Sequence, residues 1–424
     1  MKRLLEQFGV EYRWSLLTGY GLMLVAMVVQ ILLVPMYLAA LGTDGFGTLT
    51  VIVSLTTYAA VGVGWLTGGL MRILGASHAT GQQADFMQNT AAAKVLFLLY
   101  AVLLALLAVA WAAIDGRLPV SLMIVVGLYV IANQEAHVER LALSASGRLP
   151  LSNLLQIAQL VLYCGSVIVA LRLGGGLLGV FSCYLGSTLA ARALVPWAVG
   201  ERPPFWRVPW LKSIRELLSR LVGKFGGGYL LASAIVAASQ LDIVLVAVLG
   251  GVADVTRFVL IWKIAEFAVQ LLWRIPEMMV PSLIHLDATQ DSLTLRKRYV
   301  HVVGLTVVAA LIAGPTYAFF GPWMLKMWLG AEYVPQDPLG FYLAGACIVW
   351  GALARPTGVL AEALARFRLA HTVALTAIGV RLILIVVLYD RFGYLAPLVA
   401  LTIVNLCGAP VAYFLAGRKL LASS

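Results

Sequence analysis

The chain has 424 residues, of which 62% are hydrophobic and 12% are charged, and its formal net charge at pH 7 is +11. Soluble domains contain roughly 45–50% apolar and about 25% charged residues, so this composition excludes a soluble globular protein and indicates lipid as the main solvent. The apolar runs are continuous over about 20 residues rather than alternating with period two. They therefore predict membrane-spanning helices.

In chain order, the apolar runs between Gly, Pro and charged residues predict about twelve spans. They cover approximately 15–41, 47–71, 95–114, 118–139, 149–171, 176–200, 225–249, 257–284, 299–320, 338–364, 369–389 and 393–417. The fold class that follows is an all-α polytopic membrane protein. An even number of spans places both termini on one side of the membrane.

The distribution of lysine and arginine predicts the orientation, because positive charges in short loops are retained in the cytoplasm. With the N-terminus inside, roughly twenty basic residues fall in inner segments and about five in outer segments. We therefore expect a multi-pass protein of a bacterial inner membrane with both termini cytoplasmic. The same asymmetry explains much of the net charge, so no nucleic-acid partner is expected.

The longest polar connector, 201–224, separates two halves, 1–200 and 225–424, of about six spans each. A weak internal repeat supports this division. Gly19-Tyr20, an apolar helix with Gln30, and Leu41-Gly42 recur as Gly228-Tyr229, an apolar helix with Gln240, and Leu249-Gly250. Such a repeat is typical of transporters built from two parallel halves.

The eighth predicted span carries a polar stripe on one helical face, formed by Lys263, Glu266, Gln270, Arg274 and Glu277. An ionisable residue at mid-bilayer costs roughly 2.5–3.5 kcal/mol on insertion scales, so it normally faces a cavity or a partner. Two interpretations stay open. The two cations neutralise the acids three residues away, or they line a water-filled cavity and bind an anionic substrate. We favour the second.

Further charges lie inside other predicted spans. Arg192, Arg355 and Arg381 are candidate substrate contacts, because the planar guanidinium group matches phosphate and carboxylate bidentately. Snorkelling to an interface, or pairing with a protein acid, is the alternative for each. Asp242 and Glu362 are either ion-coupling sites or partners of these arginines, and we favour the partner role.

Motifs for cofactors and catalysis are absent from the sequence. The four cysteines lie in apolar stretches without metal-ligand spacing, and there is no Gly-rich nucleotide loop or nucleophile elbow. Glu135, His137 and Glu139 do not all share one helical face, so we expect a polar helix end at the interface there. We therefore expect no metal, no cofactor and no enzymatic activity.

Several segments resemble the polysaccharide transporters, or O-antigen flippases, of the MATE-like multidrug/oligosaccharidyl-lipid/polysaccharide superfamily. They are Val34-Pro35 through Gly42, Gly45 and Gly47, then Gly69 with Arg72, Ser146-Gly147-Arg148 with Asn153, and Gln240-Leu-Asp242 with Leu249-Gly250. The resemblance implies two six-helix lobes around a central cavity and alternating access. It implies an undecaprenyl-pyrophosphate-linked oligosaccharide as cargo, turned to the periplasmic leaflet for surface polysaccharide synthesis, and association with a polysaccharide polymerase or other assembly proteins. Some relatives carry two more helices than this chain.

Two other functions are weighed against the flippase. A drug or cation antiporter shares the fold but generally needs buried acids, and spans one to three carry none outside the loop residues Asp44 and Asp85. A membrane polymerase or ligase usually needs a large outer loop, and no outer connector here exceeds roughly twenty residues. The excess of intramembrane cations therefore favours transport of an anion.

Overall fold

The computed structural model of the chain describes residues 10–116, 118–199, 211–222, 240–277, 279, 283, 286, 292–335, 337–364, 367–408, 415, 417 and 418. Their regular secondary structure is helical, and no strand occurs among these residues. The expected all-α architecture is therefore confirmed. Contacts divide the chain into two compact units, the first formed by Met1–Gly45 and Thr56–Ser233 and the second by Phe46–Leu55 and Ala234–Ser424.

The first two predicted spans lie within α2 (Val10–Ala79), which consists of two helices that meet at a kink. The kink is at Gly42, whose φ of 71° and ψ of −180° are not helical. This backbone region is essentially restricted to glycine, because a Cβ would clash there. A turn was expected after Leu41, and this kink lies at that position.

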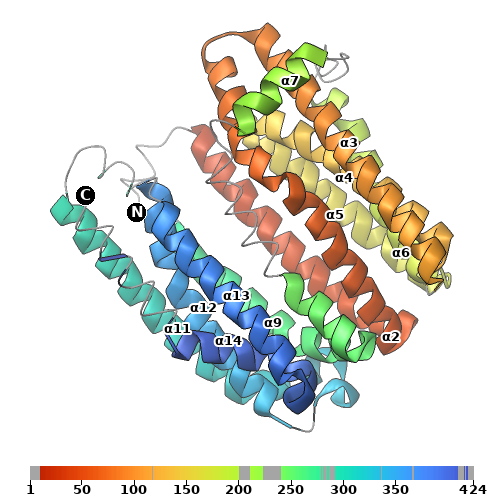
Figure 1. Cartoon of the computed structure of the whole chain (residues 1–424), viewed down its shortest axis with the longest axis vertical. Helices are drawn as coiled ribbons and strands as arrows, with labels where there is room; N and C mark the ends of the chain where they lie inside the picture. The colour runs from red at the N-terminus through yellow and green to blue at the C-terminus, as the bar shows by residue number, and fades with distance from the viewer. Residues whose placement is uncertain are drawn as a thin grey trace. The chain divides into compact units, whose positions relative to one another are not determined.

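The rest of the first unit is a group of antiparallel helices. They are α3 (Gln83–Asp115), α4 (Val120–Ala145), α5 (Leu149–Arg172), α6 (Gly176–Val199) and the short α7 (Leu211–Arg220). α3 packs along α4, and both α4 and α5 pack against α6 (Figure 1). Short turns with left-handed Gly147 and Gly174 join α4 to α5 and α5 to α6. Consequently the end of α4, the start of α5 and the end of α6 lie at the same end of this group.

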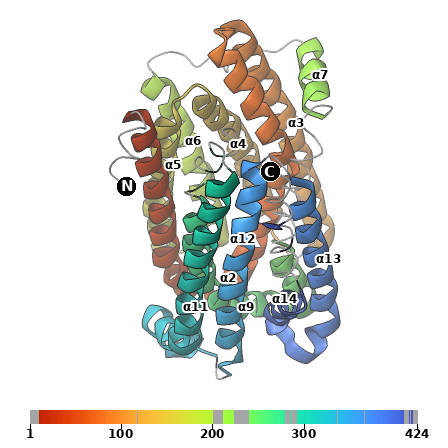
Figure 2. The same cartoon turned by 90° about the vertical axis from the view of Figure 1, so that its left-hand side faces the viewer.

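α7 belongs to the predicted connector and packs against α3 (Figure 2). It is amphipathic: Leu217 is buried, whereas Arg215 and Arg220 are exposed. The amide of Gln88 in α3 donates a hydrogen bond to Ser213 at the start of this contact. Leu217 joins a core with Leu74 of α2, so the connector contributes to the packing of the first unit.

The second unit is arranged around α12. Its helices are Gln240–Gly250, α9 (Val252–Glu277), α11 (Ser292–Leu329), α12 (Leu339–Ala363), α13 (Phe367–Phe392) and α14 (Ala396–Leu406), with 3₁₀ turns η3 (Ala331–Tyr333) and η4 (Gly393–Leu395). α12 packs against α9, α11, α13 and α14. Its contact with α11 is close, since a Cβ on Gly314 would lie 2.6 Å from the carbonyl oxygen of Gly345.

Half of the predicted domain boundary, 201–224, lies outside the described residues, and the boundary stays a prediction. One segment is grouped differently from the predicted halves, because Phe46–Leu55 belongs to the second unit. Within that unit, a Cβ on Gly47 would lie 2.0 Å from the carbonyl oxygen of Val252 at the start of α9. Only glycine permits this approach of one backbone to the other.

Eight helices among the described residues are long and apolar enough to cross a membrane. The number is smaller than twelve partly because helices that meet at a short turn are counted together. The predicted spans 15–41 and 47–71 lie on either side of the kink at Gly42 in α2, and 369–389 and the described part of 393–417 are α13 and α14, joined by η4. Of 225–249, the described part is the short helix Gln240–Gly250, and 257–284 corresponds to α9, which is rich in charge. The chain is therefore a multi-pass membrane protein.

Candidate functional site

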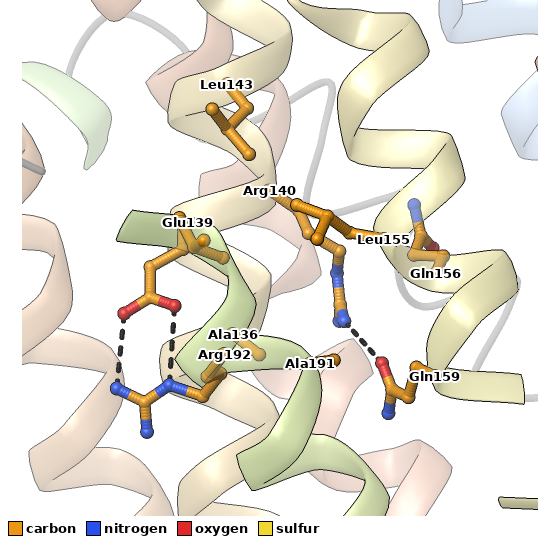
Figure 3. Close-up of a pocket in the computed structure, with 10 residues that line it drawn as sticks. Ala136, Glu139, Arg140, Leu143, Leu155, Gln156, Gln159, Ala191 and Arg192 are labelled. Carbon is orange, nitrogen blue, oxygen red and sulfur yellow. Dashed lines mark hydrogen bonds and ion pairs between the residues drawn. The ribbon is translucent and has the colours of Figure 1, made fainter. Parts of the chain in front are cut away.

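A small pocket opens between α4, α5 and α6 of the first unit (Figure 3). Its polar wall is formed by Glu139, Arg140, Gln156, Gln159 and Arg192, and its apolar wall by Ala136, Leu143, Leu155, Ala191 and Val195. These residues come from the end of α4, the start of α5 and the end of α6. The pocket therefore lies near the α4–α5 turn, which we expect on the cytoplasmic side.

α4 supplies most of the charge because its second half is unusually polar for a membrane span. The mean hydropathy of its most apolar window is 1.3, against 1.4 or more for the other seven candidate spans. The polar residues are concentrated in 133–140. The expected position at the interface stays a prediction, but α4 continues past the predicted end at 139 to Ala145, and Glu139 is only 5% exposed.

Two carboxylates of α4 are held by cations from neighbouring helices. Arg192 of α6 donates two hydrogen bonds to Glu139, from Nε to Oε2 at 3.3 Å and from Nη2 to Oε1 at 3.1 Å. Its Nη1 lies 2.5 Å from Oε2 of Glu135. Lys94 of α3 donates to Oε1 of Glu139 at 3.0 Å. The network joins α3, α4 and α6, and it places the predicted substrate contact Arg192 at the pocket with two acids.

Arg140 is the functional candidate that the sequence analysis missed. Its Nη1 donates to Oε1 of Gln159 at 3.3 Å (Figure 3). Its Nη2 donates to Oδ1 of Asn133 at 3.4 Å. Both partners are neutral amides, and no described carboxylate lies at ion-pair distance from this guanidinium. It was overlooked because the span was predicted to end at 139, which assigned Arg140 to a loop.

In the N-terminal part of the predicted stripe on α9, from Lys263 to Gln270, the polar side chains bind one another. Lys263 donates to Oε2 of Glu266 at 3.0 Å, and Gln270 donates to Oε1 of the same carboxylate at 3.2 Å. The ammonium group of Lys263 also lies 5.5 Å from the centre of the Phe267 ring. The side chain of Lys263 is 22% exposed, so it combines a counterion with limited access to solvent or lipid.

The C-terminal part of the stripe, Arg274 and Glu277, is bound to α12 through Arg355. Arg274 lies 2.8 Å from Oε2 of Glu277, and Arg355 of α12 donates to Oε1 of the same residue from Nε at 3.1 Å and from Nη2 at 2.8 Å. Trp273 fixes the same helix pair, since its indole Nε1 donates to the carbonyl oxygen of Gly351 at 3.0 Å. The structure thus brings Arg274 and Arg355 together on one acid.

The last predicted substrate contact, Arg381, forms a buried ion pair with Asp242 in the second unit. Nη2 of Arg381 in α13 lies 3.1 Å from Oδ1 of Asp242, and Arg381 is 9% exposed. The two atoms lack hydrogen-bond geometry, and the buried Nδ2 of Asn405 has no partner among the described residues. Asp242 therefore faces a cation. The side chain of Glu362 lies outside the described residues.

All five predicted cations thus face carboxylates, as the pairing interpretation requires, while their role toward a substrate stays a prediction. No group of three side chains suited to a metal ion occurs in the part of the chain that the structure describes. The four cysteines are free thiols.

Comparison with known proteins gives no match to a family model and no match to a curated protein sequence. Solved structures do match. An inward-facing multidrug resistance MATE family transporter of the MOP superfamily has a TM-score of 0.67 at 15% identity, over 95% of this chain and 95% of that chain. An outward-facing one has a TM-score of 0.62 at 15% identity, over 98% and 94%.

A third match is a MOP superfamily transporter from Pyrococcus furiosus, described as having a binding pocket of reverse polarity that suggests a different function. Its TM-score is 0.60 at 15% identity, over 98% of this chain and 94% of that chain. At such identities the likeness concerns the fold. The chain has the fold of MATE-like transporters of the MOP superfamily.

Proposed function

We propose that this chain is a MATE-like secondary transporter, and not an enzyme, that moves an organic substrate across a bacterial inner membrane by alternating access. The observation that supports the proposal is the fold, which matches transporters in inward- and outward-facing conformations over at least 95% of this chain. Fold alone does not define cargo, so the substrate class is argued from the site.

The charges favour a substrate with negative charge. Export of a cation generally requires a buried acid that is free to bind it, and the described carboxylates of the interior are engaged. Asp242 faces Arg381, and Glu139 receives Lys94 and Arg192. The guanidinium of Arg140, by contrast, has only amide partners. An antiporter that exchanges an organic anion for an ion is therefore the function we propose first.

A second candidate is a flippase that turns an undecaprenyl-pyrophosphate-linked oligosaccharide from the cytoplasmic to the periplasmic leaflet, for O-antigen or another surface polysaccharide. The position of Arg140 supports it, because the pocket lies at the helix ends that we expect to face the cytoplasm. In that case the partners are membrane lipid and a polysaccharide polymerase or other assembly proteins.

Reconstitution into liposomes tests both candidates. We expect a fluorescent organic anion to accumulate when a proton or sodium gradient is imposed, and a cation of the same scaffold not to do so. A fluorescently tagged prenyl-pyrophosphate glycan is tested in parallel by its protection from dithionite. Movement of the glycan alone selects the flippase. Movement of none of these compounds by folded protein, relative to protein-free liposomes, overturns the proposal of transport.

A further inference from the structure

Arg140 directs its charge toward the interior of the span rather than toward the nearer helix end. It lies shortly before the end of α4 at Ala145, where a long cationic side chain normally snorkels to the interface. Its Nη2 instead reaches back to Asn133, seven residues earlier. Seven residues correspond to about 10 Å of helix at roughly 1.5 Å per residue. The guanidinium group thus points toward the middle of α4 rather than toward its end at Ala145.

Arg140 is half-buried, and its hydrogen bonds are long. Distances of 3.3 and 3.4 Å to Gln159 and Asn133 exceed the usual range for N–H···O bonds, and a guanidinium group offers five N–H donors. The nearby acids Glu135 and Glu139 form ion pairs with other cations. A half-buried guanidinium group that donates only to neutral amides has donors left for a further acceptor, so this arrangement favours an anionic ligand.

The wall behind Arg140 is rigidly built. Nε2 of Gln159 donates to Oγ1 of Thr188 at 2.9 Å, and that hydroxyl donates to the carbonyl oxygen of Tyr184 at 2.8 Å. This chain of bonds fixes the amide orientation, so that Oε1 of Gln159 faces Arg140 (Figure 3). The guanidinium group is therefore held in place before a ligand binds, which lowers the cost of binding.

We propose that the pocket between α4, α5 and α6 binds a phosphate group of an amphiphile, with Arg140 as its principal ligand. This inference deepens the proposed function and rests on it. The pocket is a small, half-open hollow, so a compact headgroup rather than an oligosaccharide is the expected ligand. Phosphate is favoured because guanidinium binds it in a bidentate manner. The same chemistry is presented by a phosphorylated substrate and by an anionic lipid headgroup, and the experiment separates these sources.

The test measures binding of farnesyl pyrophosphate to the purified protein in phosphatidylcholine nanodiscs by calorimetry. Loss of a charge-assisted hydrogen bond predicts that Arg140→Gln weakens binding by about tenfold or more, while Arg140→Lys retains part of the affinity. Arg148→Gln is the matched control, because it removes the same charge from an exposed residue at the same helix ends. Glu135→Gln removes a nearby negative charge and is expected to strengthen binding several-fold.

The source of the phosphate is identified by repeating the titration in nanodiscs that contain phosphatidylglycerol. If this lipid competes with the probe in the unmodified protein but not in Arg140→Gln, the headgroup is a ligand of the pocket. If it does not compete, the phosphate belongs to the substrate. Both results require the Arg140-dependent binding described above, and both support the proposal.

The proposal is overturned if the unmodified protein does not bind the probe, or if Arg140→Gln binds it as tightly as Arg148→Gln. Should Arg140→Gln fail to fold, unchanged affinities in Arg140→Lys and Glu135→Gln overturn it equally. Binding is measured without transport. Arg140-dependent binding in a protein that moves nothing in liposomes would refute the proposed function alone. Transport by a protein in which Arg140→Gln binds the probe as tightly as Arg148→Gln would refute the pocket assignment alone.

Discussion

Replacing Glu139 by glutamine tests how strongly the charge network holds α3, α4 and α6 together. The substitution keeps the volume of the side chain and removes its charge. Lys94 and Arg192, which lie 3.0 and 3.1 Å from Oε1 of Glu139, then lose this carboxylate, and Arg192 keeps its contact with Glu135. Removing one partner of a buried ion pair costs about 3–5 kcal/mol, because the other charge is left uncompensated. We expect this loss in the apparent free energy of unfolding.

The matched control is Arg257→Gln in α9. Arg257 pairs with Asp254 at 3.3 Å, but its side chain is 63% exposed. Exposed pairs contribute about 0–1 kcal/mol. Each substitution removes one charge, in Glu139→Gln from a buried network with two cations and in Arg257→Gln from one exposed pair, so their difference compares a buried network with an exposed pair. Since about 1.4 kcal/mol is a factor of ten, Glu139→Gln should change the unfolding equilibrium more than a hundredfold and Arg257→Gln less than about sixfold.

The assay is unfolding by sodium dodecyl sulfate in mixed micelles, followed by tryptophan fluorescence and by size-exclusion chromatography. Glu139→Gln should unfold at a clearly lower detergent fraction than the unmodified protein, with Arg257→Gln close to it. If the unfolding curve of Glu139→Gln has the same midpoint and slope as that of the unmodified protein, the network contributes little to stability. Equal losses in both variants would show that burial is not the cause.

Three further predictions follow from contacts in the second unit and from the charge distribution. Asp242→Asn leaves Arg381 as an unpaired buried charge, so it should lower the folded yield in detergent more than the transport per folded molecule; normal yield with abolished transport would make Asp242 an ion-coupling residue. Gly47→Ala places a Cβ 2.0 Å from the carbonyl oxygen of Val252, so the folded fraction on size-exclusion chromatography should fall sharply, and a normal profile would disprove this close approach. A cysteine introduced at Ser424 should react with an impermeant reagent only from the cytoplasmic side, and labelling from the periplasm would overturn the orientation.

Most of the fold could be predicted from apolar runs, because a bilayer requires each spanning backbone to pair internally. The predicted spans 149–171 and 176–200 agree with α5 (Leu149–Arg172) and α6 (Gly176–Val199) within a residue. The length of the turn between the first two spans could not be predicted. Gly42 is compatible both with a loop of several residues and with one non-helical residue between two helices, and composition does not distinguish them.

The site was predictable only in part. Helical periodicity placed Lys263 and Arg274 on one face of α9, because the angle per residue is fixed within one helix. The partner of Arg355 depends on how α12 packs against α9, which neither helix specifies alone. Arg140 was missed although a signal existed, namely the density of polar residues in 133–140. A span boundary set by hydropathy excludes such residues because they lower the average.

The placement of Phe46–Leu55 in the second unit affects attempts to divide the protein. The chain passes between the two units three times, at Gly45/Phe46, Leu55/Thr56 and Ser233/Ala234. A cut in the connector at 201–224 would therefore produce a C-terminal fragment that lacks the segment carrying Gly47. Co-expressed halves should regain a native fold only if Phe46–Leu55 of the N-terminal fragment packs into the C-terminal fragment. A C-terminal fragment expressed alone should aggregate.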